Sequence, residues 1–258
     1  MASTDRFGYE WGKYNYIISE YDLQFLKWIK PLDQTFFKDK TILDAGCGMG
    51  RNTYWIVRYG AKRAVAFDFD ERSVAAARNT LREFPNASVV YADIEKFQTN
   101  ERFDLVLSIG VIHHLKNPHA ALVNLARFVK PGGKLLIWVY GYEGNEWIVR
   151  WISPLRIYIT SRLPVGLVHI LTYGFSIPLY LYVKLLPQRS AYLKQLRGFR
   201  FDHIHSIVFD HLIPSIANYY TRDEAQHLLS NLAELTEVST HRVNNNSWTV
   251  TGIKSDTV

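Results

Sequence analysis

The residues best suited to chemistry in this 258-residue chain lie between the apolar run that ends on Asp44 and the one that ends on Asp68, twenty-four positions later. Glycines at positions 46, 48 and 50 follow Asp44 at a spacing of two. Glycine permits positive φ and lets the backbone approach a ligand without a Cβ in the way. A glycine loop between a strand and a helix builds a nucleotide crevice, and an acidic residue ending the next strand can accept hydrogen bonds from ribose hydroxyls.

Two adjacent histidines offer a general base. His113 and His114 follow the apolar stretch 103–110, where open α/β sheets bind ligands outside the carboxyl ends of their strands. An unperturbed histidine titrates near pH ~6.5, which suits proton removal at neutral pH. We therefore predict that one of the pair is catalytic; the alternative is that one packs against the following helix.

A second group of polar residues lies in FDHIHSIVFDH, residues 201–211. Imidazole and carboxylate suit several divalent ions, but the i, i+4 spacing of a helical zinc motif is missing, so we expect no metal site. We predict instead that His205 and Asp210 bind substrate, the alternative being a solvated or internally bonded segment. Tyr219 and Tyr220 are expected to roof the same substrate.

Aromatic residues are dense near the N-terminus. Residues 6–16 contain Tyr9, Trp11 and Tyr14, which either close over a bound ligand or fasten the N-terminus to the body of the protein. Helical spacing of apolar residues continues to position 29, and Pro31 stops it. We expect residues 1–35 to cap the ligand crevice.

Five apolar segments that alternate with helical patterns must position these side chains. The expected strands are 41–45, 64–68, 88–93, 103–110 and 134–141, with helices at 51–59, 71–83 and 118–129. Strands that are apolar on both faces indicate a parallel sheet covered by helices on both sides. Thr221 and Glu224 form a capping box for a helix ending near residue 232, and 235–243 with 247–254 form a hairpin.

The alternation of strand and helix patterns stops in the region 142–220. Residues 163–183 carry no formal charge, and their length reaches the roughly 20 residues of a membrane span. Prolines and glycines interrupt the run, so a single span is disfavoured. Basic residues and tryptophans surround it, which is typical of a segment at a membrane surface. We predict a helical substrate lid, with peripheral membrane contact through 147–189 as a compatible alternative.

Composition bears on the partners of the protein and on its cellular compartment. The net charge of +6 is compatible with nucleic acid, anionic lipid or an anionic substrate and selects none of them. The single cysteine, Cys47, excludes an internal disulfide and favours a reducing compartment. The N-terminus lacks an apolar core of signal-peptide length. We expect a cytoplasmic protein, peripheral at the membrane if the insertion docks there.

The loop D-A-G-C-G-M-G, the acidic end at Asp68, Ala92-Asp93, a P-G-G turn before the fifth strand and the closing hairpin together resemble the class I S-adenosylmethionine-dependent methyltransferases. The resemblance covers roughly 36–141 and 221–254. It implies an α/β, Rossmann-like, seven-stranded and mainly parallel sheet with an antiparallel C-terminal hairpin. The core would comprise 36–141 and 221–258, with 142–220 inserted after strand five.

The resemblance also implies roles around the cofactor S-adenosylmethionine. Asp44, Gly46 and Gly48 would border its methionine part. The ribose and adenine would contact four residues: Asp68, Phe69, Asp93 and Ile94. Ser108 and Ile109 would face the methyl-donor side.

The expected activity is O-methylation of a small or lipid-linked acceptor, with His113 or His114 as base. The alternatives are an N- or C-methyltransferase and, less favoured, a cofactor-binding scaffold without catalysis. Amino-methylating nucleic-acid enzymes of the class carry an Asn- or Asp-Pro-Pro-aromatic loop after strand four, which is missing here, and the positive charge is scattered. No nucleic-acid partner is therefore expected.

Overall fold

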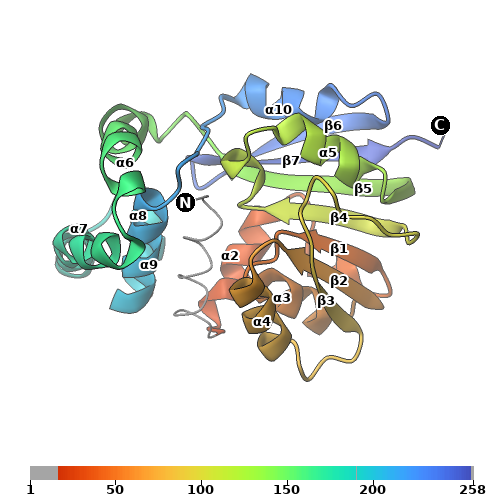
Figure 1. Ribbon diagram of the computed structural model, residues 1–258, viewed down its shortest axis with the longest axis horizontal. Helices are drawn as coiled ribbons and strands as arrows, with labels where there is room; N and C mark the ends of the chain where they lie inside the picture. Colours follow the sequence, from red (N-terminus) through yellow and green to blue (C-terminus); the bar gives the residue numbers. More distant parts are fainter. Residues whose placement is uncertain (1–16, 190, 257–258) are drawn as a thin grey trace.

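In the computed structural model, which describes residues 17–189 and 191–256, seven strands form one mixed sheet in the order β3-β2-β1-β4-β5-β7-β6 (Figure 1). The strands are β1 (Thr41–Ala45), β2 (Arg63–Asp68), β3 (Ala87–Tyr91), β4 (Phe103–Ile109), β5 (Val129–Tyr140), β6 (Leu235–Val243) and β7 (Ser247–Lys254). β1 to β5 pair in parallel, and β7 runs antiparallel to β5 and β6. The predicted Rossmann-like sheet with an antiparallel C-terminal hairpin is confirmed.

Helices cover both faces of the sheet, as strands that are apolar on both sides require. They are α2 (Glu20–Trp28), α3 (Arg51–Arg58), α4 (Glu71–Thr80), α5 (Pro118–Ala126) and α10 (Arg222–Ser230). On one face α5 and α10 bury side chains such as Leu125 and Leu229 against the strands. On the other, α2 and α3 bury Phe25 and Ile56.

The helix starts follow the local chemistry of the sequence. The Asp70 carboxylate accepts the backbone N–H groups of Arg72 and Ser73 at the start of α4. At the start of α10, Thr221 and Glu224 form both hydrogen bonds of a capping box. Such caps satisfy N–H groups that have no partner within the helix.

The fifth strand differs from the prediction. β5 begins at Val129, which pairs with Phe103, so the Pro-Gly-Gly segment lies inside the strand. The pairing with β4 shifts register after Phe103. Gly133 fits this irregularity because a Cβ there would lie 2.9 Å from the Lys130 carbonyl oxygen. Because β5 already begins at Val129, the helix expected to reach residue 129 ends earlier, at Ala126.

Four helices form the insertion at one end of the sheet (Figure 1). They are α6 (Ser153–Tyr158), α7 (Val165–Leu185), α8 (Ala191–Gly198) and α9 (Phe201–Leu212). Backbone hydrogen bonds fasten the return of the chain to the sheet: Asn218 N–H donates to the His113 carbonyl (2.9 Å), and Tyr220 N–H donates to the Tyr140 carbonyl (3.0 Å). These bonds anchor the segment that follows α9 beside the carboxyl ends of β4 and β5.

Candidate active site

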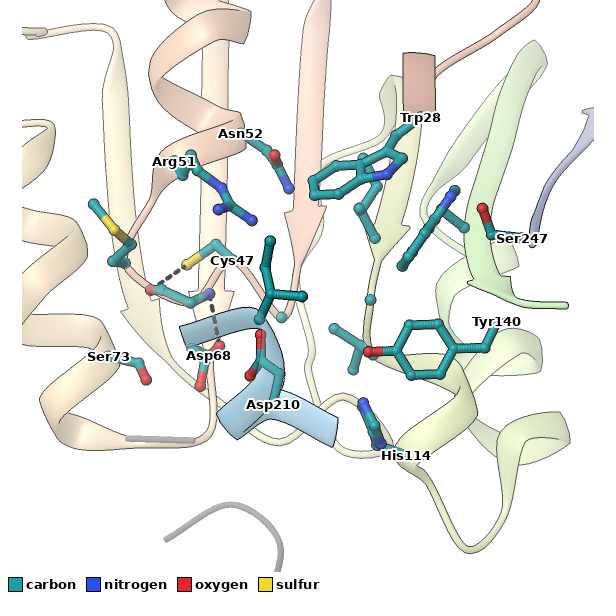
Figure 2. A pocket seen from close by; sticks show the side chains of 18 of the residues that line it. Trp28, Cys47, Arg51, Asn52, Asp68, Ser73, His114, Tyr140, Asp210 and Ser247 are labelled. Carbon is teal, nitrogen blue, oxygen red and sulfur yellow. Dashed lines mark hydrogen bonds between the residues drawn. The ribbon is translucent and has the colours of Figure 1, made fainter. Parts of the chain in front are cut away.

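A cavity of about 790 Å³ lies beyond the carboxyl ends of β1 and β4, and α2, α8 and α9 contribute to its lining. At this point the order of the parallel strands reverses, which is where open α/β sheets bind ligands. The volume is within the usual range for small-molecule sites. Figure 2 shows side chains of the glycine loop, β5 and α9 converging on this space.

The loop after β1 needs glycine for two reasons. Gly46 has φ +78°, and a Cβ there would lie 2.4 Å from Cγ2 of Val111. The N–H groups of Gly46 and Cys47 both donate to the Phe67 carbonyl, at 2.9 and 3.0 Å. Gly48 N–H donates to Oδ2 of Asp68 at 2.9 Å (Figure 2). The loop backbone is therefore fixed against β2, and Gly46 and Gly48 line the cavity.

The two acidic residues occupy different places. Asp68 lines the cavity and also accepts Asp70 N–H at 3.0 Å; its burial raises the pKa of the carboxyl. Asp44 is 1% exposed, lies beneath the loop rather than in the cavity lining, and accepts the Thr53 hydroxyl at 2.6 Å. Burial raises the pKa of Asp44 to about 6. Asp68 can contact a ligand, whereas Asp44 fixes the loop from below.

Cys47 lies inside the same loop and is buried. Burial and the nearby carboxylates of Asp44 and Asp68 raise the pKa of its thiol well above the usual value. A thiol without thiolate character is a poor nucleophile. The residue therefore contributes packing.

The predicted adenine-side residues lie together. Phe69, Asp93 and Ile94 all line the cavity, and Oδ1 of Asp93 accepts Glu95 N–H at 2.9 Å. Of the two residues predicted at the methyl-donor side, Ile109 lines the cavity. The Ser108 hydroxyl instead donates to the Ala45 carbonyl at 2.9 Å and joins β4 to β1.

The histidine pair divides into one buried and one cavity residue. His113 is fully buried below the cavity, its ring centroid 3.9 Å from that of Tyr140. His114 lines the cavity, and its Nδ1 lies 2.7 Å from the Ile216 carbonyl oxygen. Since a carbonyl only accepts, Nδ1 carries the proton and Nε2 is the acceptor nitrogen. Burial lowers the pKa of His114 to about 4, although the bond to Ile216 opposes this, so the ring is neutral at pH 7.

Helix α9 separates the polar residues that the sequence places close together. His203, Ser206 and Asp210 line the cavity at helical spacing, and Figure 2 shows Asp210 projecting from α9 into it. His205 points instead to α7, where its Nδ1 lies 2.8 Å from the Ser176 hydroxyl. Asp210 thus lies where substrate could bind, and His205 does not.

The remaining predicted substrate residues lie elsewhere. Tyr219 and Tyr220 line a smaller neighbouring cavity of about 490 Å³ together with His227. Tyr219 also stacks on Tyr140, with ring centroids 5.5 Å apart. The three N-terminal aromatics predicted to bind substrate, Tyr9, Trp11 and Tyr14, lie outside the described residues.

Several cavity residues were missed by the sequence analysis. Arg51, the first residue of α3, lines the cavity with its guanidinium carbon 4.5 Å from the Tyr21 ring centroid and 5.4 Å from that of Trp28. Its position directly after the third glycine was the available signal. Tyr140 and His211 also line the cavity, from β5 and α9.

Comparison with known proteins agrees with this geometry. Residues 43–137 match the family model described as a methyltransferase domain. Residues 43–137 are therefore a methyltransferase domain. The matched segment contains the glycine loop, Asp68, Asp93 and the histidine pair, and it ends before the insertion.

The curated relatives share part of this chain. The tRNA U34 carboxymethyltransferase of Actinobacillus succinogenes is 33% identical over 124 residues, which is 46% of this chain and 39% of that protein. The enzyme of the same name from Mannheimia succiniciproducens is 30% identical over 159 residues, 58% and 50% of the two chains. The chain therefore matches half or less of the length of these two relatives.

These relatives contradict the prediction that no nucleic acid is a partner, because their name describes action on tRNA. That prediction relied on the scattered basic residues and on the loop after β4. Phosphate contacts need individual lysines and arginines on a surface rather than a continuous run. Scattered charge was therefore not a sound basis for the exclusion.

Solved structures of low identity share the fold of the methyltransferase domain. Magnesium protoporphyrin IX methyltransferase from Synechocystis PCC 6803 superposes with a TM-score of 0.56 at 13% identity, covering 97% of this chain and 94% of that one. DhpI in complex with SAH gives a TM-score of 0.61 at 14% identity, covering 98% and 96%. At this level of identity the similarity concerns the fold alone.

Proposed function

We propose that the chain transfers the methyl group of S-adenosylmethionine to an oxygen atom of an acceptor bound between the glycine loop and α9. One observation carries this proposal: His114, with its tautomer set by Ile216, lines the same cavity as the glycine loop and Asp68. A neutral imidazole with an acceptor nitrogen beside the cofactor cleft can take up a hydroxyl proton, and its pKa of about 4 makes it a weaker base than the unperturbed histidine expected from the sequence.

The residues present fit the cofactor. The cradle left by Gly46 and Gly48 admits a ligand against the backbone, and a Cβ at Gly46 would overlap Val111. Asp68 would accept the ribose hydroxyls. The guanidinium of Arg51 lies on the same cavity and would hold the cofactor's carboxylate, since its fork matches carboxylate geometry.

The adenine would lie between apolar neighbours. Phe69 and Ile94 line that side of the cavity, and Asp93 would accept from the amino group. Asp44 would act indirectly by holding the loop through Thr53.

The cofactor supplies an electrophilic methyl group on its sulfonium. The chain's own residues hold the acceptor in line with that group and exclude water, which is the larger part of catalysis for such a displacement. His114 accepts the hydroxyl proton at Nε2. His113 supports the wall by packing under Tyr140. N- or C-methyl transfer could dispense with the base, so the effect of removing His114 separates these reactions.

The acceptor we favour is a small or lipid-linked molecule, because the cavity of about 790 Å³ has a size usual for small-molecule sites and α8 and α9 contribute to its lining. A nucleotide of RNA is the second candidate, supported by the names of the curated relatives. Those names also specify a carboxymethyl group, so the mass of the transferred group is part of the test.

The experiment is an incubation of the protein with S-adenosylmethionine labelled in its methyl group and with separate tRNA, lipid and small-molecule extracts. Label in the lipid or small-molecule fraction, lost in a His114→Ala variant, supports the proposal. Label confined to tRNA would replace the favoured acceptor with the second candidate. No transfer to any fraction by a protein that binds the cofactor would overturn the proposal.

We further propose that the insertion contacts an anionic lipid surface while the core stays in the cytoplasm. Helix α7 is long and apolar enough, by length and composition, to cross a membrane. Yet its polar residues His169, Thr172 and Ser176 are buried, and Ser176 contacts His205 of α9, which favours a helix lying on the core over one that spans.

The opposite face of α7 supports the lipid surface as its partner. Large apolar side chains are exposed there, Ile170 by 65% and Leu185 by 74%. Between Glu146 and Asp202 the sequence has eight basic residues and no acidic one. Exposed apolar area bordered by positive charge is typical of helices that lie in a membrane interface.

A further inference from the structure

Arg156, on α6, is buried without a counter-ion. Its side chain is among the largest that are fully buried, with 2% exposure. Nη2 lies 3.3 Å from the Ser153 hydroxyl and 3.5 Å from the Ala217 carbonyl oxygen. Nε and Nη1 are buried and make no hydrogen bond of good geometry, and the neutral phenol of Tyr219 is the other polar side chain beside the guanidinium. In the described part of the chain no carboxylate forms an ion pair with this guanidinium.

A buried charge without a counter-ion destabilises the folded protein. Arginine stays protonated when buried, and the free energy of hydration that it loses is then not replaced by an interaction with an opposite charge. Arg156 therefore calls for an anion that the described residues do not supply, or for a reason to hold positive charge at this place.

The charge lies near one end of the cavity, because Arg156 reaches the carbonyl of Ala217, the residue next to Ile216, whose carbonyl holds His114. We call the surface formed by His114, Tyr140 and His211 the inner wall; all three line the cavity. The positive charge of Arg156 contributes to lowering the pKa of His114 and of His211, after the larger effect of burial. Charges interact more strongly in the interior than in water, so Arg156 makes the inner wall electropositive while the wall itself stays neutral.

The inner wall also offers hydrogen-bond donors. Tyr140 lies between the two histidines, with ring centroids 5.7 Å from each. The Tyr140 hydroxyl and an imidazole N–H of His211 can donate to an oxyanion, whereas the N–H of His114 is held by the Ile216 carbonyl. Figure 2 shows His114 and Tyr140 at the same side of the cavity.

We propose that the inner wall is the subsite for an oxyanion group, carboxylate or phosphate, on the acceptor, with the buried guanidinium of Arg156 as its counter-charge. Arg156 is a positioning residue, because its charge would act on the bound anion through the inner-wall residues without contacting the anion. This inference rests on the proposed function and specifies the acceptor: a molecule that carries an acidic group beside the methylated oxygen. A neutral acceptor of the same shape binds more weakly.

The test measures binding without methyl transfer. The full chain, with its histidines isotopically labelled, is titrated with benzoate, phenyl phosphate and neutral benzamide, and the ring signals of His114 and His211 are followed by NMR. We expect at least one anion to shift both signals and to bind at least tenfold more tightly than benzamide. Preference for benzoate indicates a carboxylate acceptor, and preference for phenyl phosphate indicates a phosphate. If neither anion shifts these signals, or benzamide binds equally well, the proposal is wrong.

Two variants separate the charge from the fold. Arg156→Gln should remove the preference for the anion, and Arg156→Lys should retain most of it. Arg150→Gln, at an exposed arginine of the same insertion, should leave the preference unchanged. An Arg156→Gln variant that folds and keeps the preference would contradict the proposal. If it does not fold, the comparison of anion and benzamide on the unmodified chain decides. Failure of the proposed function would appear as loss of cofactor binding or transfer, neither of which this titration measures.

Discussion

The imidazole Nδ1 of His114 lies 2.7 Å from the backbone carbonyl oxygen of Ile216. This contact joins the sheet to the segment that returns from the insertion, more than a hundred residues further along the chain. The carbonyl sets the imidazole tautomer and leaves Nε2 as the acceptor nitrogen. The proposed base is therefore oriented by the same segment that anchors α9 beside the strand ends.

Replacing His114 tests its role as base. General base catalysis is worth about 10²- to 10⁴-fold, so His114→Ala should lower kcat by about that factor. His114→Gln can still donate to the Ile216 carbonyl but cannot take up a proton, and it should be as slow. Because the pKa of His114 is lowered to about 4, wild-type activity should lose this base only as the pH falls toward that value. The control is His119→Gln, at an exposed histidine.

A His114→Gln variant with near-normal kcat would show that the ring only positions its neighbours. A steep loss of wild-type activity around pH 6.5, removed by the same substitution, would contradict the neutral state of the His114 ring at that pH.

Asp44 should make stability depend on pH. Its pKa is raised from 3.8 to about 6 by burial, so the folded state favours the protonated carboxyl. This contribution is fully present below pH ~4 and is lost as the pH rises through about 6, reducing the free energy of unfolding by roughly 3 kcal/mol. Asp44→Asn keeps an acceptor for Thr53 and removes the titration. Urea unfolding at several pH values should show the wild type losing stability relative to this variant between pH 4 and 7.

Asp104 is a control for the Asp44 prediction, because its contribution to stability should change with pH in the opposite direction. Hydrogen bonds from Thr41 and Lys130 outweigh burial and hold the pKa of Asp104 below its usual range. Its contribution is present above the unfolded pKa and is lost as the pH falls through the folded pKa. Asp104→Asn should therefore flatten the acid side of the stability profile. Equal pH slopes for the wild type and Asp44→Asn would contradict the Asp44 prediction.

The exposed face of α7 should bind anionic vesicles. We expect the protein to float with vesicles of phosphatidylcholine and phosphatidylglycerol at low salt, and less so at high salt, because salt screens surface charge. Ile170→Gln with Phe175→Gln should abolish flotation, since both side chains are exposed on this helix. Leu23→Gln, at an exposed leucine of α2, is the matched control. Absence of flotation at low salt would leave α7 with the role of a lid only.

Local sequence patterns were sufficient to predict much of the sheet and of the glycine loop. The boundaries of β6 and β7 agree with the hairpin pattern, and the Thr221 capping box lies where its spacing placed it. The glycine loop and Asp68 meet as expected because a strand, a tight turn and a neighbouring parallel strand allow little freedom. The Pro-Gly-Gly segment was misjudged because a bulge within β5 and a turn before it have the same residue preferences.

The acceptor side was less predictable. Knowing that 201–212 is a helix would have separated His203 and Asp210 from His205, since side chains two positions apart point to different faces. Nothing local to Tyr219 indicates that it stacks behind Tyr140. The electrostatic effect of Arg156 on His114 and His211 likewise depends on how the insertion folds back onto the sheet, for which the sequence has no local signal.

The most direct test is calorimetric titration of the protein with S-adenosylmethionine. The wild type should bind one equivalent, and Asp68→Ala should weaken binding at least tenfold, because the carboxylate is proposed to accept the ribose hydroxyls and also holds Gly48 at 2.9 Å. Glu71→Ala, at an exposed acidic residue nearby, should bind normally. Unchanged affinity in a folded Asp68→Ala protein, or no binding by the wild type, would contradict the assignment of this cavity to the cofactor.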